Sequence, residues 1–338
     1  VPYFDVVKAA TIPALLYFLG IWLGVHFEAR RSNLKGVPRS ELPKPWEILK
    51  ERGHLAIPLI VIIYLLVSGF TPMRAALWAI VLAIAASSLR KSTRMKPVEI
   101  VRGLENGARN VLGVLVACAS AGIIIGVVTK TGVGLKLASA LLDLSGGMLL
   151  PTMFFTMITS IILGMGVPTT ANYVITSTIA APALVQMGVP VLAAHMFVFY
   201  FGIIADVTPP VALAAFAGSA ISGGKPLKTG INASKLAIAA FIIPYIFVLS
   251  PVVLMIDATP ISLITVLVTS VIGMIGLSAS MIGCLVKPLN GLERVMLFVG
   301  GLLMIQPGLV TDLVGFLLLA SVLFFQQRRS KAEASSLG

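Results

Sequence analysis

The chain has 338 residues, of which 58% are hydrophobic and only 11% are charged, and its mean hydropathy is +1.02. A soluble globular domain carries roughly one quarter charged residues, whereas several apolar runs here reach the roughly 20 residues that span a bilayer. The composition therefore excludes a soluble protein and predicts an all-α, polytopic helical membrane protein embedded in a lipid bilayer.

The formal net charge of +12 is concentrated in two connections between apolar runs, at residues 30–52 and 90–109. Basic connections of this kind are typical of cytoplasmic loops. We therefore interpret the charge as a topology signal and expect no nucleic-acid partner. Cys118 and Cys284 lie in apolar runs with no CxxC partner, and the three histidines have no metal-ligand spacing, so we expect no cofactor.

The first half of the chain predicts a series of helices and spans. They lie at about 6–28, 54–70, 73–89, 90–109, 110–128 and 134–144. The segment at 90–109 alternates valine and leucine with charges at helical spacing, which predicts a separate amphipathic helix on the cytoplasmic surface. The chain opens with Val1 and enters an apolar helix almost at once, so we expect it to be a piece of a longer protein.

Two long apolar stretches follow, and each is interrupted near its middle. The stretch at 148–187 is broken by GMGVPTTAN (164–172), and the stretch at 191–222 is broken by DVTPP (206–210). A span at about 236–256 and two or three spans between 261 and 326 complete the chain, before a polar tail for which we expect disorder.

Charge bias constrains how the interrupted stretches cross the membrane. With both early basic loops inside, residue 130 lies outside, while Lys225, Lys228 and Lys235 place the later loop inside. The chain must therefore cross the membrane an odd number of times between residue 130 and the later loop. One broken stretch should therefore cross and the other should enter and return as a hairpin, but the charges do not show which is which.

The break at 206–210 exposes backbone oxygen atoms. Pro209 and Pro210 lack N–H groups, so we expect the carbonyls of Ala205 and Asp206 to lose their helical partners. Thr208 adds a hydroxyl and, because it precedes proline, is pushed from helical dihedrals. Such oxygens are hard ligands suited to an alkali cation. Asp206 is a functional candidate by default, with a lysine pair or an interfacial position as the alternative.

The break at 164–172 combines residues that loosen the backbone with polar side chains, namely Gly164, Gly166 and Pro168 followed by Thr169, Thr170 and Asn172. A helix that begins near Thr170 would direct its positive end at the break. Discontinuous helices that meet near the midplane are typical of secondary transporters, which bind Na⁺ with carbonyls and anions with helix N-termini. A simple kink is the alternative for either break.

The stretches LGMGVPTTANYVITSTIAAPAL and FVFYFGIIADVTPPVALAAF resemble the large membrane subunit of TRAP transporters (tripartite ATP-independent periplasmic transporters). More closely, they resemble the fused permeases of the TAXI subgroup. The opening VPYFDVVKAATIPALLYFLGIWLGVHFEARRSNLKGVPRSELP resembles the stretch after the first broken helix of those proteins. KPLNGLERVMLFVGGLLMIQPGLVTDLVGF resembles the extra C-terminal domain that many of them carry.

This resemblance implies a permease subunit for Na⁺-coupled import of a small organic anion such as a carboxylate, without ATP hydrolysis. It implies a periplasmic TAXI-type substrate-binding protein as partner and a multi-pass location in a bacterial or archaeal inner (plasma) membrane. It also implies two inverted repeats, each with a re-entrant hairpin followed by a discontinuous helix. On that pattern the chain holds the second repeat, with its hairpin tip at 164–172 and its helix break at 206–210.

The first repeat's hairpin and broken helix, together with the small-subunit portion, are not in this sequence. We therefore expect the chain to be the C-terminal portion of a longer permease, with the small-subunit portion fused upstream. The expected organisation is transmembrane helices with basic loops (1–130), a second transport repeat (131–256), a C-terminal transmembrane extension (257–326) and the polar tail (327–338).

The predicted site has two parts. The candidate Na⁺ ligands are Gly164, Gly166, Thr169, Thr170, Asn172, Asp206 and Thr208, and the candidate substrate contacts are Thr170, Asn172, Pro209 and Pro210. The alternatives are a proton-coupled carrier that uses Asp206, a channel, or a non-transporting structural subunit. An enzyme is disfavoured because HExxH and GxSxG are absent, and the other candidate membrane aspartates, Asp257 and Asp312, lie at segment ends.

Overall fold

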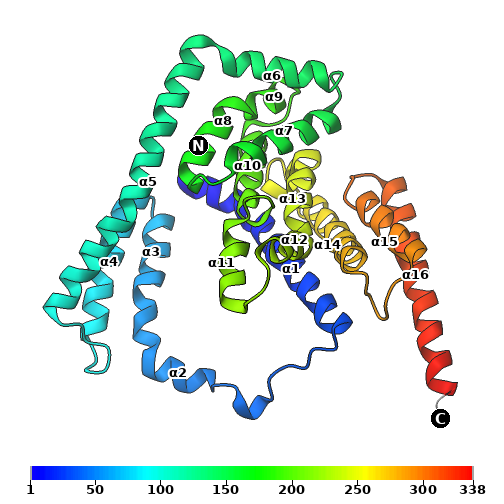
Figure 1. Ribbon diagram of the computed structural model, residues 1–338, viewed down its shortest axis with the longest axis horizontal. Helices are drawn as coiled ribbons and strands as arrows, with labels where there is room; N and C mark the ends of the chain where they lie inside the picture. Colours follow the sequence, from blue (N-terminus) through cyan, green and yellow to red (C-terminus); the bar gives the residue numbers. More distant parts are fainter. Residues whose placement is uncertain (1, 337–338) are drawn as a thin grey trace. The chain divides into compact units, whose positions relative to one another are not determined.

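The computed structural model describes residues 2–336, and among these residues it contains helices and no strand (Figure 1). Four helical segments are long and apolar enough to cross a membrane: Tyr3–Arg31, Pro226–Leu249, Pro260–Ile282 and Leu309–Arg328. A fifth candidate is the pair Cys118–Thr131 and Val133–Leu144, which is bent by 75°. The prediction of a polytopic helical membrane protein is thereby confirmed.

The helices fall into two compact units. The first contains the residues up to Lys8 together with Lys35–Val116, and the second contains Ala9–Leu34 together with the residues from Ala117 onward. The helical segments of the first unit beyond α1 are η1 (Arg39–Glu41), α2 (Pro45–Arg52), η2 (Gly53–Ala56), α3 (Ile57–Val67), α4 (Pro72–Ser88) and the beginning of α5 (Pro97–Thr131).

Helices α3 and α4 of the first unit pack against each other and correspond to the predicted spans at 54–70 and 73–89. They are joined by a turn in which Gly69 has a φ of +84° and Thr71 caps α4 by accepting the Arg74 N–H. Helix α4 has the 17 residues that the sequence predicts, whereas α3 has only 11, because the beginning of its predicted span forms η2.

The two basic connections meet at one end of the α3–α4 pair. His54 Nε2 lies 2.9 Å from Thr93 Oγ1, and Arg90 donates to the Glu51 carbonyl at 2.8 Å. Residues about 40 positions apart in the chain are therefore held together, as the positive-inside interpretation requires of two loops on one side of a membrane.

Helix α5 differs from the sequence-based expectation. The sequence predicts an amphipathic helix at 90–109 and a separate span at 110–128, whereas one continuous helix covers Pro97–Thr131. The physical reason is that no proline follows Pro97 in this helix, and isolated glycines such as Gly107 weaken a helix by only about 1 kcal/mol each. The change from an amphipathic to an apolar pattern therefore does not mark the end of a helix.

The second unit contains most of α1, the end of α5 and the helices from α6 onward. Their bounds are α1 (Tyr3–Arg31), α6 (Val133–Leu144), α7 (Leu149–Gly164), α8 (Thr169–Ile179), α9 (Ala181–Gln186), α10 (Val191–Ile204), η3 (Ala205–Val207), α11 (Leu213–Ser222), α12 (Pro226–Leu236), α13 (Ile238–Leu249), η4 (Pro251–Leu254), α14 (Pro260–Ile282), α15 (Gly291–Leu303) and α16 (Leu309–Ser336).

The core of this unit lies between α10 and α13. Phe197 and Phe201 of α10 are fully buried, and their ring centroids are 4.7 Å apart. Tyr245 of α13 packs edge-on against both rings, at 5.5 Å and 6.0 Å. Buried aromatic side chains contribute large apolar area in defined edge-to-face geometry, so they fix the position of α10 on α13.

Helix α1 crosses α13 and α14 through small residues. A Cβ atom at Gly20 would collide with Ala239 and Met274, and one at Gly24 would lie 3.0 Å from the Leu236 carbonyl oxygen. Small residues at such points let two membrane helices approach closely. The position of α1 matters for the site because α1 forms one wall of the cavity beside α10.

A buried polar network joins the C-terminal helices. It links side chains of α15 and α16 to the loop between α14 and α15. Gln326 of α16, which is 1% exposed, accepts the backbone N–H groups of Val286 and Lys287, both at 3.1 Å, and donates to Glu293 at 3.2 Å. Glu293 also closes a capping box with Asn290 at the start of α15. These bonds hold the α15–α16 pair to α14.

The expected disorder of the polar tail is wrong for residues 327–336, where α16 continues to Ser336. The segment contains neither glycine nor proline before Ser336 and includes alanine, glutamate, lysine and arginine, which are good helix formers. Polarity alone therefore does not end this helix.

We expect Gln326→Leu to lower the free energy of unfolding by about 1–3 kcal/mol, because two part-buried N–H groups and the Glu293 carboxylate each lose one hydrogen bond. The matched control is Gln327→Leu at the next, exposed position, which should change stability little. Thermal unfolding of both variants in detergent measures the difference. Equal midpoints for the two variants would contradict the proposed role of the network.

Candidate functional site

The first break separates α7 from α8 and forms the tip of a hairpin. Helix α7 ends at Gly164, Met165 is extended, Gly166 has a φ of +72°, and Pro168 precedes the first turn of α8. A positive φ favours glycine, which lacks a Cβ. Because α9 contacts both α6 and α7, the chain returns from the tip towards the beginning of α7.

The second break separates α10 from α11. Helix α10 tightens into η3, Thr208 is extended, and the chain turns through Pro209 and Pro210 before Ala212, which has a φ of +41°. Helix α11 begins at Leu213 and leads away from the cluster of α7, α8 and α10 (Figure 1). The interruption predicted at 206–210 is thus present as a non-helical segment.

The hydrogen bonds at this break correct one part of the sequence-based expectation. The Ala205 carbonyl accepts the Thr208 N–H at 3.3 Å, because the chain adopts a tighter 3₁₀ turn. The Thr208 hydroxyl donates to the Ile204 carbonyl at 2.7 Å, and the Val207 carbonyl accepts the Ser234 hydroxyl at 3.0 Å. Among the described residues, no donor reaches the carbonyl of Asp206.

The tip of the hairpin lies directly against α10, one turn before the second break. A Cβ atom at Gly164 would lie 2.7 Å from the Gly202 carbonyl oxygen and 2.9 Å from Asn172 Nδ2. A Cβ atom at Gly202 would lie 2.5 Å from the same amide nitrogen. The two glycines therefore leave room for the Asn172 side chain between α7, α8 and α10.

Asn172 is the most enclosed polar group of the predicted site. It is 2% exposed, and its Oδ1 atom has no hydrogen-bond partner among the described residues. Next to Asn172 on the surface of α8, Ala171 and Ile175 pack against Ala121 of α5. A buried acceptor without a donor costs about 1–3 kcal/mol, so an unoccupied amide oxygen at this position is available to a cation or water.

The structure brings together only part of the predicted site. Gly164 and Asn172 lie at α10, whereas Gly166, Thr169 and Thr170 are exposed at the tip. Thr208 and Pro209 are half-buried, and Pro210 is exposed. No hydrogen bond joins either tip threonine to Thr208 in the described part of the chain.

Sequence reasoning missed Gly202, which forms the contact surface of α10. The available signal is a glycine four residues before Asp206 in an otherwise apolar helix, FYFGIIAD. A glycine in such a helix often marks close backbone approach. Its partner could not be identified from spacing, because Gly164 and Asn172 are 30 or more residues away.

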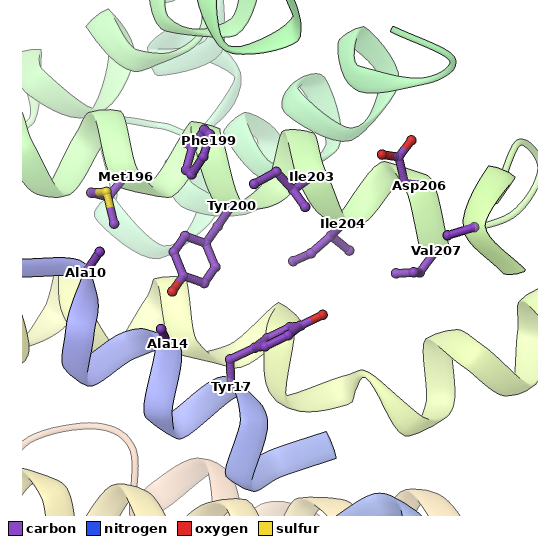
Figure 2. Close-up of a pocket in the computed structure, with 11 residues that line it drawn as sticks. Ala10, Ala14, Tyr17, Met196, Phe199, Tyr200, Ile203, Ile204, Asp206 and Val207 are labelled. Carbon is purple, nitrogen blue, oxygen red and sulfur yellow. The ribbon is translucent and has the colours of Figure 1, made fainter. Parts of the chain in front are cut away.

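A cavity of about 480 Å³ lies beside the second break, between α1, α10, η3 and α11. In Figure 2 the phenol rings of Tyr17 and Tyr200 lie between α1 and α10, and the Asp206 carboxylate points away from α1. The remaining lining is apolar, from residues such as Ala14, Phe199 and Ile203. The volume is in the range of small-molecule sites.

The Asp206 side chain is half-buried and makes no ion pair and no hydrogen bond within the described residues. The described residues therefore contain no lysine pair for Asp206, which was the alternative. A carboxylate without a partner in an apolar setting is a default candidate for function in a membrane protein.

We expect Gly202→Ala to lower stability by about 1–3 kcal/mol, because its new methyl group overlaps the Asn172 amide. Asn172→Ala in the same chain should restore much of the loss, since the three atoms nearest to that methyl all belong to Asn172. The control is Gly218→Ala in α11, where a Cβ meets no atom within 4 Å. Thermal unfolding provides the measurement, and a loss that Asn172→Ala leaves unchanged would refute the contact.

Comparison with known proteins gives a match that includes both breaks. The model of the tripartite ATP-independent periplasmic transporter family, DctM component, matches residues 1–262, which include both breaks and end at the beginning of α14. No match was found among curated proteins or among solved structures. Because the match covers more than half of the 338 residues, it shows the family. The chain belongs to the DctM component family of tripartite ATP-independent periplasmic transporters, which are membrane permeases and not enzymes.

Proposed function

We propose that the chain is the second-repeat portion of a permease that imports a small organic anion, such as a carboxylate, together with Na⁺. The observation that carries the proposal is the contact of the hairpin tip with α10 at Gly164, Asn172 and Gly202, one turn before the second break. Two interrupted segments that meet in this way present backbone and amide oxygens to one place.

The ligands available for Na⁺ are neutral oxygens. Asn172 Oδ1 and the Asp206 carbonyl have no donor, and the Thr208 hydroxyl keeps a free lone pair while it donates to Ile204. A hard cation satisfies several such oxygens at once, which offsets the cost of leaving them in an apolar region. The predicted Na⁺ site is therefore proposed around Asn172, Asp206 and Thr208.

The substrate anion is proposed to bind at the N-terminus of α8. This helix has no side-chain cap, so the N–H groups of Thr169 and Thr170 are free, and the positive end of its dipole faces the tip. Both threonines are exposed and could add hydroxyl donors to a carboxylate. Pro209 and Pro210 are the proposed apolar contacts from the other break.

The proposed partners rest on the family and on the resemblance to its TAXI subgroup. We propose a periplasmic TAXI-type binding protein as the source of substrate, and a first repeat and small-subunit portion as the rest of the permease. The proposed location is the inner (plasma) membrane of a bacterium or archaeon. The basic loops joined by His54 and Arg90 are proposed to lie on the cytoplasmic side.

One observation favours a second coupling mode. Asp206 has no hydrogen-bond or ion-pair partner among the described residues, so it could take up and release a proton as the transport domain moves. Proton coupling through Asp206 is therefore the second candidate, and a structural role without transport is the third.

The complete permease, reconstituted in liposomes, should take up substrate only when its binding protein and an inward Na⁺ gradient are both present. An imposed proton gradient without Na⁺ should give uptake near background. Radiolabelled carboxylate uptake measures this. Full uptake with the proton gradient alone, lost in Asp206→Asn, would replace Na⁺ coupling by proton coupling, and silence under every gradient would support the structural role.

Thr208→Val keeps the shape of the side chain but removes one oxygen ligand. We expect the half-saturating Na⁺ concentration to rise about tenfold, which corresponds to about 1.4 kcal/mol of lost binding free energy. The matched control is Thr178→Val in α8, because Thr178 is also half-buried and donates to a carbonyl four residues earlier. If both variants keep the wild-type Na⁺ dependence, Thr208 is not a ligand.

A further inference from the structure

Helix α7 carries a row of buried hydroxyl groups that leads to the hairpin tip. Thr152, Thr156 and Ser160 follow one another at four-residue spacing, and the next position in the row is Gly164. All three hydroxyl residues are 0% exposed. Residues four apart are neighbours on the helix surface, and each step turns by about 40°, so Ser160 points nearly the same way as Gly164 and the row winds gradually around α7 from there.

The orientation of the row follows from the contacts of Gly164. This glycine faces Gly202 of α10 and Asn172 of α8, so the tip end of the row lies where α7 meets these two helices. Helix α8 adds the buried hydroxyl of Thr176 one turn after Asn172. Buried polar side chains from both arms of the hairpin therefore lie inside it.

The hydroxyls along the row differ in their hydrogen bonds. At the end far from the tip, Thr152 donates to the Met148 carbonyl at 2.8 Å and lies 2.7 Å from the Ser145 hydroxyl. Thr156 Oγ1, Ser160 Oγ and Asn172 Oδ1 have no partner in the described part of the chain. Three unpartnered polar atoms thus lie in sequence between a satisfied end and the tip.

Close helix packing alone does not explain these hydroxyls. Alanine packs at least as closely and leaves no unsatisfied group, whereas each buried hydroxyl without a partner costs about 1–3 kcal/mol. Thr159 lies on the same helix outside the row, and its hydroxyl donates to the Phe155 carbonyl four residues earlier at 2.9 Å. Thr156 and Ser160 make no such bond, so their oxygens remain available to a ligand.

The spacing of the row fits water. A rise of four residues along an α-helix is about 6 Å, and two hydrogen bonds of about 2.8 Å that meet at the near-tetrahedral angle of a water molecule span about 4.6 Å. A short chain of one or two waters between successive hydroxyls would therefore satisfy both neighbours. The same oxygens would solvate a small alkali cation that moves along the row.

We propose that the row Thr152–Thr156–Ser160, with Asn172 at the end next to the tip, is a hydrated track through the hairpin. It binds water and admits an alkali cation to or from the tip. The identity of the ion as the coupling Na⁺ rests on the proposed function, whereas the hydration of the track does not. The exit of the ion would then pass through the interior of the hairpin rather than around it.

Silver ion provides the test, because it is a small monovalent cation that travels in water and binds thiols. The two native thiols are first removed by Cys118→Ala and Cys284→Ala. Ser160→Cys and Thr156→Cys then place a thiol in the row, and Met153→Cys places one at an equally buried apolar position of α7. Thiols left free by silver are counted with maleimide after denaturation.

We expect silver to react with the thiols at positions 156 and 160 at least tenfold faster than with the thiol at 153, and Na⁺ to slow both reactions. Equal rates at the three positions would overturn the track. Gel filtration shows whether each variant folds. Because two positions in the row are used, the test can still be carried out with one variant if the other fails to fold.

A second measurement separates this inference from the proposed function. Thr156→Val should lower the maximal rate of Na⁺-driven uptake several-fold, whereas Thr159→Val should not. Fast silver reaction in a permease without Na⁺-dependent uptake would support the track and refute the coupling ion. Normal Na⁺-dependent uptake with unreactive thiols at 156 and 160 would leave the proposed function standing and overturn the track.

Discussion

The close approach of the hairpin tip to α10 is the contact on which the rest of the site depends. Backbone groups at a helix break cannot remain unpaired in hydrocarbon, so an interrupted segment must be covered by protein or reached by water. Gly164 and Gly202 allow the two segments to meet without side chains between their backbones, and Asn172 occupies the remaining space. Each break is therefore partly covered by the segment that carries the other.

Helix α12 supports the second break from the other side. Ser234 satisfies the Val207 carbonyl, and a Cβ atom at Gly230 would lie 3.2 Å from Pro209 and 3.3 Å from Ala212. The non-helical segment is thus packed between α12 and the hairpin region rather than left as a loose loop. This support explains how a segment with two prolines keeps one conformation while leaving the Asp206 carbonyl without a donor.

The positions of both breaks could be predicted from the sequence because glycine and proline act on their own neighbours. The family could also be predicted, since its motifs lie at the same two places. The hydrogen bond of the Ala205 carbonyl could not be predicted, because the prolines that follow are compatible both with a 3₁₀ turn and with a carbonyl that has no donor. The role of Gly202 depends on Gly164 and Asn172, and contacts across such distances in the chain have no local signature.

The hydrophobic pattern also explains where the sequence-based boundaries failed. It located α14 and α16 but split α5, because a change from a mixed to an apolar face was interpreted as a chain break. Thr169 and Thr170 are exposed, which polarity alone does not predict, and their role as ion ligands stays a prediction.

The capping of α14 has a mechanical consequence for the C-terminal extension. The carbonyls at the end of this helix accept hydrogen bonds from Arg31 of α1, at 2.7 Å, and from Arg294 of α15, at 2.9 Å and 3.3 Å. Charge-assisted bonds of this kind are about twice as strong as neutral ones. Since α1 packs on α13 as well, we expect these helices to move as one rigid body. The C-terminal extension would then stiffen the set of helices against which the hairpin can move.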